Sequence, residues 1–262
     1  MATSVLPAKG ALGYMPGLRG AQKPTRAPYD LPQLDECTHC QASREGFFCQ
    51  LSPTATRALN QIRRSTSYPA GAVLYLEGEA ARGVYLVCHG RVKLMTASSE
   101  GKTLIVKIAG PGEVLGLHAA LSGSKHETSV ETLQPTQVSY INREDFLRFI
   151  KDHSEACLRV AQHLGRDCHS AYELVRSIGL SNSVPEKLAR FLSEWSAGGQ
   201  LINGFVRTKL SLTHEEMAQL IGCSRESVSR ALSDFRRQGL IELNGATLTL
   251  RNKAEIERLG SI

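Results

Sequence analysis

The stretch LTHEEMAQLIGCSRESVSRALSDFRRQGLIELNGATLTL, residues 212–250, carries the most specific pattern in the chain. Thr213 and Glu216 form a capping box, which predicts that a helix begins here. Gly222 permits a tight turn after this helix, and Ser224 can cap a second one. The apolar residues of the first helix fall on one face, which consists of Met217, Leu220 and Ile221. Two short helices joined by a glycine turn are therefore predicted.

The second predicted helix has two chemically different faces. Its apolar face consists of Val228, Ala231, Leu232 and Phe235, and its polar face of Arg225, Glu226, Ser229 and Arg230. In the major groove of DNA, an arginine can donate two hydrogen bonds to guanine, and a glutamate can accept one from a cytosine amine. The next residues, LIEL-NG-ATLTL, predict a hairpin with an Asn244-Gly245 turn.

Cap, turn, polar face and hairpin in this order predict a winged helix-turn-helix that binds double-stranded DNA. Its predicted contacts are the polar face of the second helix together with Thr213 and Ser224 at the two helix starts. Arg236 and Arg237 are either phosphate contacts or solvated side chains. The alternative for the whole stretch is a solvated helical hairpin with ordinary surface charges.

Upstream, the spacing of apolar residues changes twice. Between Tyr68 and Ile141 apolar and polar residues alternate, and glycines recur at hairpin distances, which predicts a β-barrel or jelly roll. From Arg143 the period is helical for about thirty-five residues. Within it a heptad seam predicts one long helix that pairs with a second copy, unless the helix packs on its own β-domain. The seam consists of Cys157, Ala161, Leu164, Cys168, Ala171, Val175 and Ile178.

These segments together predict an α+β chain with four parts. A flexible tail (1–34) precedes a cysteine-rich segment with a β-roll sensor domain (35–150), a dimerisation helix (151–182) and the winged helix-turn-helix domain (183–262). The net charge of +6 is compatible with a polyanionic partner. No apolar run is long enough to span a membrane and no secretion signal is present, so we expect a cytoplasmic protein.

The chain shows no catalytic signature. It has no Ser-His-Asp order, phosphate-binding loop or pair of carboxylates with catalytic spacing, so we expect no enzyme and assign no catalytic residue. A rival hypothesis is an enzyme or electron carrier that uses the cysteines directly. Seven cysteines in a reducing compartment favour thiols or metal ligands over disulfides.

The segment GCSRESVSRAL resembles the recognition helix of the Crp/Fnr superfamily of bacterial transcription regulators. YPAGAVLYLEGE, VYLVCHGRVKL and PGEVLG are similar to the β-roll motifs of that family, and the resemblance covers roughly residues 35–255. It implies a homodimer in which Arg225, Glu226 and Arg230 read an inverted repeat with TTGA- or TGTGA-like half-sites. It also implies RNA polymerase as a partner.

The sequence differs from the cyclic-nucleotide branch of this family at the ligand-binding motif. That branch has a Gly-Glu pair and then an Arg-Ser pair. Here Leu117 follows Gly116, and Glu127 lies in the region of the arginine. Glu127 would repel a cyclic phosphate, so cyclic AMP is not expected unless Lys125 takes the arginine's role.

Cys37-x2-Cys40-x8-Cys49 resembles the N-terminal ligands of the oxygen-sensing Fnr branch, which hold a [4Fe-4S] cluster with a fourth cysteine in the β-roll. The second gap is longer than in that branch, and Ser139 occupies the place of the fourth cysteine. Cys88 lies on a strand that we expect beside the strand of Ser139, so it is the predicted fourth ligand.

Three alternatives to this cluster remain open. His39 or His89 could complete a zinc site with three cysteines. The cysteines could instead be packed without a metal, in a regulator controlled by another small ligand or by its abundance. If a cluster does form, we expect its assembly or loss to alter the packing of the β-roll against the heptad seam.

Overall fold

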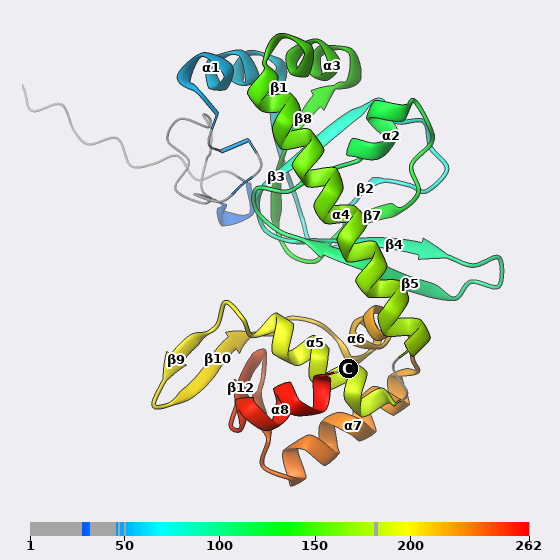
Figure 1. The fold of residues 1–262 in the computed structure, drawn as a ribbon, viewed down its shortest axis with the longest axis vertical. Coiled ribbons are helices and arrows are strands. Elements are labelled where there is room, and N and C mark those ends of the chain that lie inside the picture. Colours follow the sequence, from blue (N-terminus) through cyan, green and yellow to red (C-terminus); the bar gives the residue numbers. More distant parts are fainter. Residues whose placement is uncertain (1–27, 32–45, 47, 50, 181–182, 262) are drawn as a thin grey trace, which may run out of the picture.

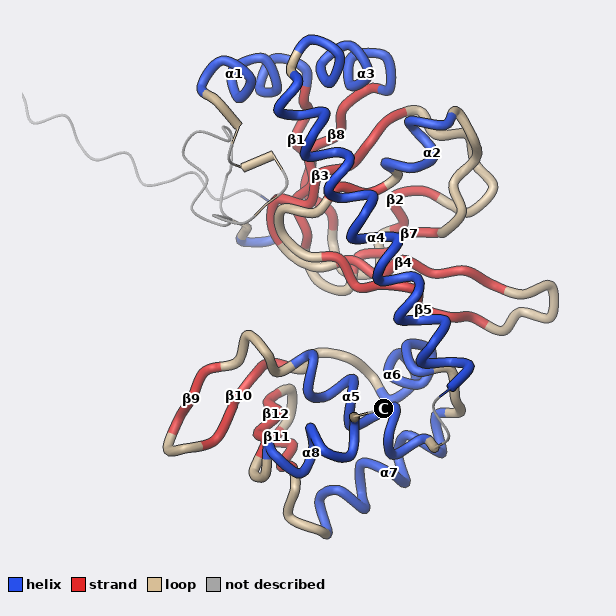
Figure 2. The backbone as a smooth tube through the Cα atoms, viewed as in Figure 1, coloured by secondary structure: helices blue, strands red, loops and turns tan. Residues whose placement is uncertain are grey.

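The structure is a computed structural model that describes residues 28–31, 46, 48–49, 51–180 and 183–261. Most of the predicted tail, and with it Cys37, His39 and Cys40, lies outside the described residues. Figure 1 shows two units joined by one long helix, α4 (Ser154–Leu180). The predicted α+β architecture is confirmed, because strands dominate the first unit and helices lie beside a small sheet in the second (Figure 2).

The first unit is the predicted β-roll, built from two antiparallel sheets. One sheet has the strand order β1-β8-β3-β6 and the other β2-β7-β4-β5. Buried aliphatic residues from both sheets fill the core, including Val84, Leu86 and Val130. Its elements are α1 (Pro53–Ile62), β1 (Arg63–Tyr68), β2 (Val73–Tyr75), β3 (Gly83–His89), β4 (Val92–Ala97), β5 (Thr103–Ala109), β6 (Val114–Leu115), α2 (Leu117–Ser122), β7 (Ser129–Thr132), β8 (Thr136–Asn142) and α3 (Arg143–Asp152).

The helical period that begins at Arg143 corresponds to two helices, α3 and α4, and the helix predicted over residues 151–182 begins at Ser154. α3 ends before His153, whose backbone is extended with φ −124° and ψ 93°, and α4 begins at Ser154. α3 belongs to the β-roll: Phe146 and Phe149 are buried, and each makes an edge-on ring contact with Phe48. The break at His153 lets α4 leave this core in another direction.

α4 packs on the β-roll by one face only. Ala156, Val160 and His163 are buried on that face. Most of the predicted seam lies outside this contact: Cys157, Ala161, Cys168, Ala171 and Val175 are exposed, whereas Leu164 is half-buried and the side chain of Ile178 lies outside the described residues. The seam is therefore open to a further partner.

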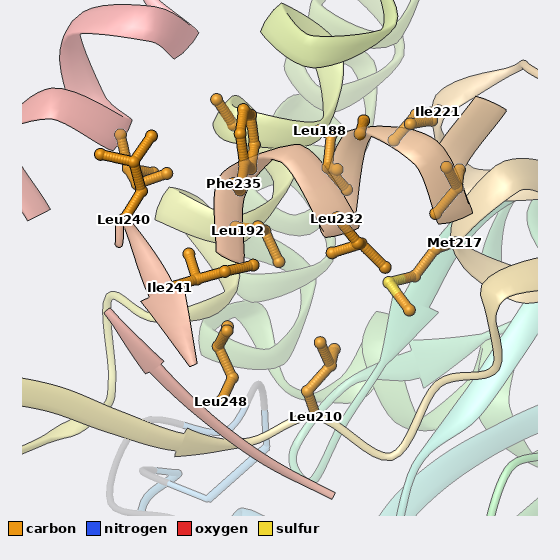
Figure 3. Packing of buried hydrophobic residues seen from close by; sticks show 14 of the residues in the cluster. Leu188, Leu192, Leu210, Met217, Ile221, Leu232, Phe235, Leu240, Ile241 and Leu248 are labelled. Carbon is orange, nitrogen blue, oxygen red and sulfur yellow. The ribbon is translucent and has the colours of Figure 1, made fainter. Parts of the chain in front are cut away.

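The second unit packs four helices against a small sheet of strand order β11-β12-β10-β9. Leu192, Leu232 and Leu248 lie in its core, where helices and strands meet (Figure 3). Its elements are α5 (Val184–Trp195), β9 (Gln200–Ile202), β10 (Phe205–Lys209), α6 (His214–Ile221), α7 (Arg225–Arg237), β11 (Ile241–Asn244), β12 (Thr247–Leu250) and α8 (Lys253–Gly260).

The hairpin after α7 turns one residue later than the sequence predicts. Asn244 still belongs to β11 and pairs with Thr247, so the two loop residues are Gly245 and Ala246. Gly245 takes the positive φ of 56° that the first central residue of a two-residue hairpin loop requires. None of the helices in the described segments combines the length and apolar character needed to cross a bilayer.

Candidate nucleic-acid interface

The predicted capping box at the start of α6 is present. The Thr213 hydroxyl accepts a hydrogen bond from the backbone N–H of Glu216 at 3.1 Å, and the Glu216 carboxylate accepts one from the backbone N–H of Thr213 at 2.9 Å. Gly222 ends the helix in the left-handed conformation, with φ 68°. These local bonds fix where α6 begins and ends, and therefore where α7 can begin.

α7 has the two faces that its sequence predicts. The Ser224 hydroxyl caps it by accepting a hydrogen bond from the backbone N–H of Ser227 at 3.2 Å. The whole predicted apolar face, Val228, Ala231, Leu232 and Phe235, is buried. The side chains of Arg225, Glu226 and Arg230 are exposed, and Ser229 is half-buried. The first two turns of α7 thus present charged groups to solvent on a rigid, internally packed helix.

The carboxylate of Glu226 is held in its ionised form. Hydrogen bonds from its own backbone N–H and from the Ser224 hydroxyl hold its pKa below the ordinary value. An ionised carboxylate only accepts hydrogen bonds, as recognition of a base amine requires.

A histidine that the sequence prediction omitted joins the two helices beside this face. His214 is the first residue of α6, and its Nδ1 lies 2.8 Å from the hydroxyl oxygen of Ser229. The only signal in the sequence is a histidine directly after the capping residue Thr213. The candidate interface therefore includes α6 as well as α7.

α6 also contacts the β-roll. Lys93 of β4 lies between Glu131 of β7 at 3.0 Å and Glu216 of α6 at 3.1 Å. Nearby, the guanidinium of Arg91 lies 4.7 Å from the ring centre of Trp195 in α5. A charged contact and a cation–π contact thus hold the two units together beside the start of α6.

A cavity of about 190 Å³ lies between the β-roll and α4. Gly116, Leu117 and Glu127 line it, so the segments predicted to correspond to the family's ligand motif do meet there. Glu127 contacts His118 at 2.5 Å. Lys107 also lines the cavity but already pairs with Glu113 at 2.6 Å and Asp167 at 2.9 Å. No arginine is among the described residues around it, and Lys125 lies elsewhere.

The wall of this cavity also contains a buried aromatic pair. The rings of Tyr75 and His126 stack with 3.8 Å between their centres. Burial lowers the pKa of His126, although Glu127 and Glu79 oppose this, and burial raises the pKa of Tyr75. Uncharged aromatic groups beside paired ions make this cavity a poor site for an isolated phosphate.

Two of the four predicted metal ligands, Cys49 and Cys88, lie in the described residues. The strand of Cys88 does neighbour that of Ser139, as predicted: Leu86 pairs with Ser139, and the sulfur of Cys88 lies 3.3 Å from the Ser139 hydroxyl. Cys88 packs against the same core as Phe48, the neighbour of Cys49. Within the described ranges, no three residues of His, Cys, Asp or Glu are grouped to hold a metal ion.

Comparison with protein families assigns both units. Residues 65–153 match the model of the cyclic nucleotide-binding domain, and residues 186–259 match the Crp-like helix-turn-helix domain. The two matches coincide with the β-roll and with the unit that carries α6 and α7.

Known proteins resemble the chain over most of its length. It is 28% identical over 221 residues to a CRP-like cAMP-activated global transcriptional regulator of Mycobacterium tuberculosis, covering 82% of this chain and 96% of that protein. It is 25% identical over 226 residues to the nitrogen fixation regulation protein FixK of Bradyrhizobium diazoefficiens, covering 86% and 94%.

Among solved structures, FixK2 from Bradyrhizobium japonicum superimposes with a TM-score of 0.69 at 25% identity, covering 77% of this chain and 98% of that one. The fold, the two matched domains and these relatives agree with one another. The chain therefore belongs to the Crp/Fnr family of DNA-binding transcription regulators.

Proposed function

We propose that the protein is a homodimer that binds a palindromic promoter site, with one α7 helix in the major groove of each half-site. The observation that carries this proposal is the exposed face of α7, where Arg225, Glu226 and Arg230 project from a helix whose other face is fully buried. Two such helices related by a two-fold axis read two half-sites of opposite direction. The resemblance favours TTGA- or TGTGA-like half-sites.

Dimerisation through α4 is supported by its exposed apolar side chains. Leu158, Tyr172 and Val175 are 60%, 66% and 69% exposed, which is unusual for large apolar residues on a single helix. Val175 belongs to the heptad seam, and Leu158 and Tyr172 directly follow the seam residues Cys157 and Ala171. A second α4 packed in parallel would cover all of them.

Selection from a pool of random duplexes tests this function directly. We expect the full-length protein to enrich an inverted repeat, and light scattering to give the mass of a dimer both free and on the selected duplex. Enrichment of no sequence, or binding of a single half-site by a monomer, would contradict the proposal. Transcription from a promoter with the selected site would then show whether RNA polymerase responds.

The proposed input is a [4Fe-4S] cluster held by Cys37, Cys40, Cys49 and Cys88. The positions of Cys49 and Cys88 support it, and Cys37 and Cys40 lie outside the described residues. Cys88 lies on a strand beside Ser139, and Phe48 connects the Cys49 turn to the core on which Cys88 packs. Thiolates suit iron–sulfur clusters and zinc alike.

Anaerobic purification separates these metals. A cluster gives a brown protein with absorbance near 400 nm that bleaches in air; zinc gives a colourless protein with stoichiometric metal. For zinc, His89 is a candidate, because its Nδ1 is buried without a hydrogen-bond partner among the described residues. Cys88→Ser should abolish metal binding, whereas Cys168→Ser, on exposed α4, should not. Metal-free protein with full DNA binding would contradict control by a metal.

A second candidate input is a small ligand in the cavity between the β-roll and α4, in a regulator without metal. The position of the cavity supports this candidate, because Asp167 and Ala171 of the proposed dimer helix line the cavity. Glu127 disfavours cyclic AMP, so calorimetry should show no binding of this nucleotide. If neither metal nor ligand alters DNA affinity, control by abundance is favoured.

A further inference from the structure

We propose that His214 determines base specificity by fixing the direction of the hydrogen bond that the Ser229 hydroxyl makes in the groove. This inference rests on the proposed function, because it assumes that α7 reads DNA. His214 itself contacts no base in this proposal; it is a positioning residue that acts through Ser229.

The geometry places this pair at the edge of the polar face of α7. Ser229 directly precedes Arg230 and lies one turn after Glu226, and its hydroxyl oxygen is 2.8 Å from Nδ1 of His214. Both residues are half-buried, so the bond is partly shielded from water. Among the described residues, the Ser229 hydroxyl and the His214 ring make no other hydrogen bond, so each group can still bind a further partner.

The bond matters because a serine hydroxyl has one proton and two lone pairs. If Nδ1 accepts, the hydroxyl proton points at His214, and only lone pairs face the groove. Those lone pairs match the amine of adenine or cytosine. If Nδ1 carries a proton, it donates to Ser229, whose own proton can then reach guanine or the O4 atom of thymine. One serine can therefore read opposite classes of base.

The polyanionic duplex favours the first arrangement for a neutral imidazole. With its proton on Nε2, the ring can donate that N–H to water or to a phosphate, while Nδ1 accepts from Ser229. With the proton on Nδ1, the lone pair of Nε2 is left beside the phosphates, which repel it. Ser229 thus acts as an acceptor in the groove and selects a base that carries an amine.

Selection from random duplexes tests the inference. We expect wild-type protein to prefer adenine or cytosine by at least about fivefold at one position of each half-site. His214→Ala and Ser229→Ala should each remove that preference at the same position, and the double variant should lose no more. Ser233→Ala, one turn further along α7 and exposed, is the matched control and should keep it.

The outcomes separate this inference from the proposed function. If wild-type protein enriches no sequence, the proposed function fails. If wild-type protein enriches a palindrome but His214→Ala keeps the full base profile while Ser229→Ala changes it, the role of His214 is overturned. A preference for guanine or thymine at the Ser229 position would overturn the acceptor assignment. Weaker binding of His214→Ala with unchanged base ranking would reduce His214 to a structural contact.

Discussion

Helices α7 and α4 each expose a surface of distinct character, and the two surfaces are chemically opposite. The exposed face of α7 carries Arg225, Glu226 and Arg230, whereas that of α4 carries large apolar side chains. A charged face on a rigid helix suits a hydrated polyanion, and an apolar face needs another protein surface to cover it. The two faces therefore imply different partners, and changes to them should give different defects.

The largest expected effect comes from a charge on the apolar face of α4. Val175→Asp would bring two carboxylates together across the proposed two-fold axis. We expect the dimer to dissociate and affinity for the palindrome to fall on the order of 100-fold, because two linked half-site contacts become independent. Analytical ultracentrifugation and a binding titration measure the two effects.

Gln162→Asp is the matched control, since Gln162 is exposed on the same helix but outside the heptad seam. It should leave both the mass and the affinity unchanged. A dimeric Val175→Asp protein would show that another surface holds the subunits together. The apolar face of α4 would then not be the dimer interface.

A smaller and different defect is expected on α7. Arg230→Ala should cost about 1–3 kcal/mol of specific binding and relax selection at one position, while the protein stays dimeric. Arg236→Ala, near the end of the helix, should instead weaken binding to all DNA sequences by a similar and smaller factor. It should also lower the dependence of the DNA affinity on salt concentration. If Arg230→Ala lowers the affinity for random and for selected DNA equally, Arg230 does not contact a base.

The two helices also differ in how much of them the sequence predicts. The start and the buried face of α7 follow from Ser224 and the spacing of apolar residues, because capping and helical periodicity act over three or four residues. The start of α4 does not follow in this way. α3, which ends at the break before His153, packs through Phe146 and Phe149 on Phe48, which is distant in the sequence.

Other features escape prediction for the same reason. The register of β11 and β12, set by pairing across the strands, moves the turn from Asn244-Gly245 to Gly245-Ala246. The bond from His214 to Ser229 spans fifteen residues, and that from Lys93 to Glu216 spans 123. The position of Cys88 beside Ser139 was predictable, because it follows from the strand order of a known architecture.

The reading face of α7 depends on its neighbour α6, whereas the apolar face of α4 does not. Thr213→Ala removes the capping hydroxyl of α6 and should cost about 1 kcal/mol of unfolding free energy in denaturant titrations. The dimer mass should not change. Ser211→Ala, exposed and two residues earlier, is the control and should be neutral; an equal loss there would mean that the cap contributes nothing.

The smallest effect is expected from the contact that anchors α6 to the β-roll. Burial favours a raised pKa for Glu216, but hydrogen bonds from Thr213 and Lys93 outweigh it and lower the pKa below the ordinary 4.5. As the pH falls below 4.5, the unfolded chain takes up the proton first, so the stability from this carboxylate is present at neutral pH and lost in acid. Burial favours a lower pKa for Lys93, but Glu131 and Glu216 outweigh it and raise the pKa. The stability that the charged amine of Lys93 contributes is therefore lost when the amine deprotonates in alkali.

Glu216→Gln should therefore lower the unfolding free energy at pH 7 by at most about 1 kcal/mol, and the difference from wild type should shrink as the pH falls through the acid range. Glu215→Gln, one residue earlier and exposed, is the matched control and should leave the unfolding free energy at pH 7 unchanged. A pH-independent difference for Glu216→Gln would assign its role to the neutral capping bond and not to the ion pair with Lys93. In that case the β-roll would hold α6 through packing and the Arg91–Trp195 contact, and charge on α6 would matter only for DNA.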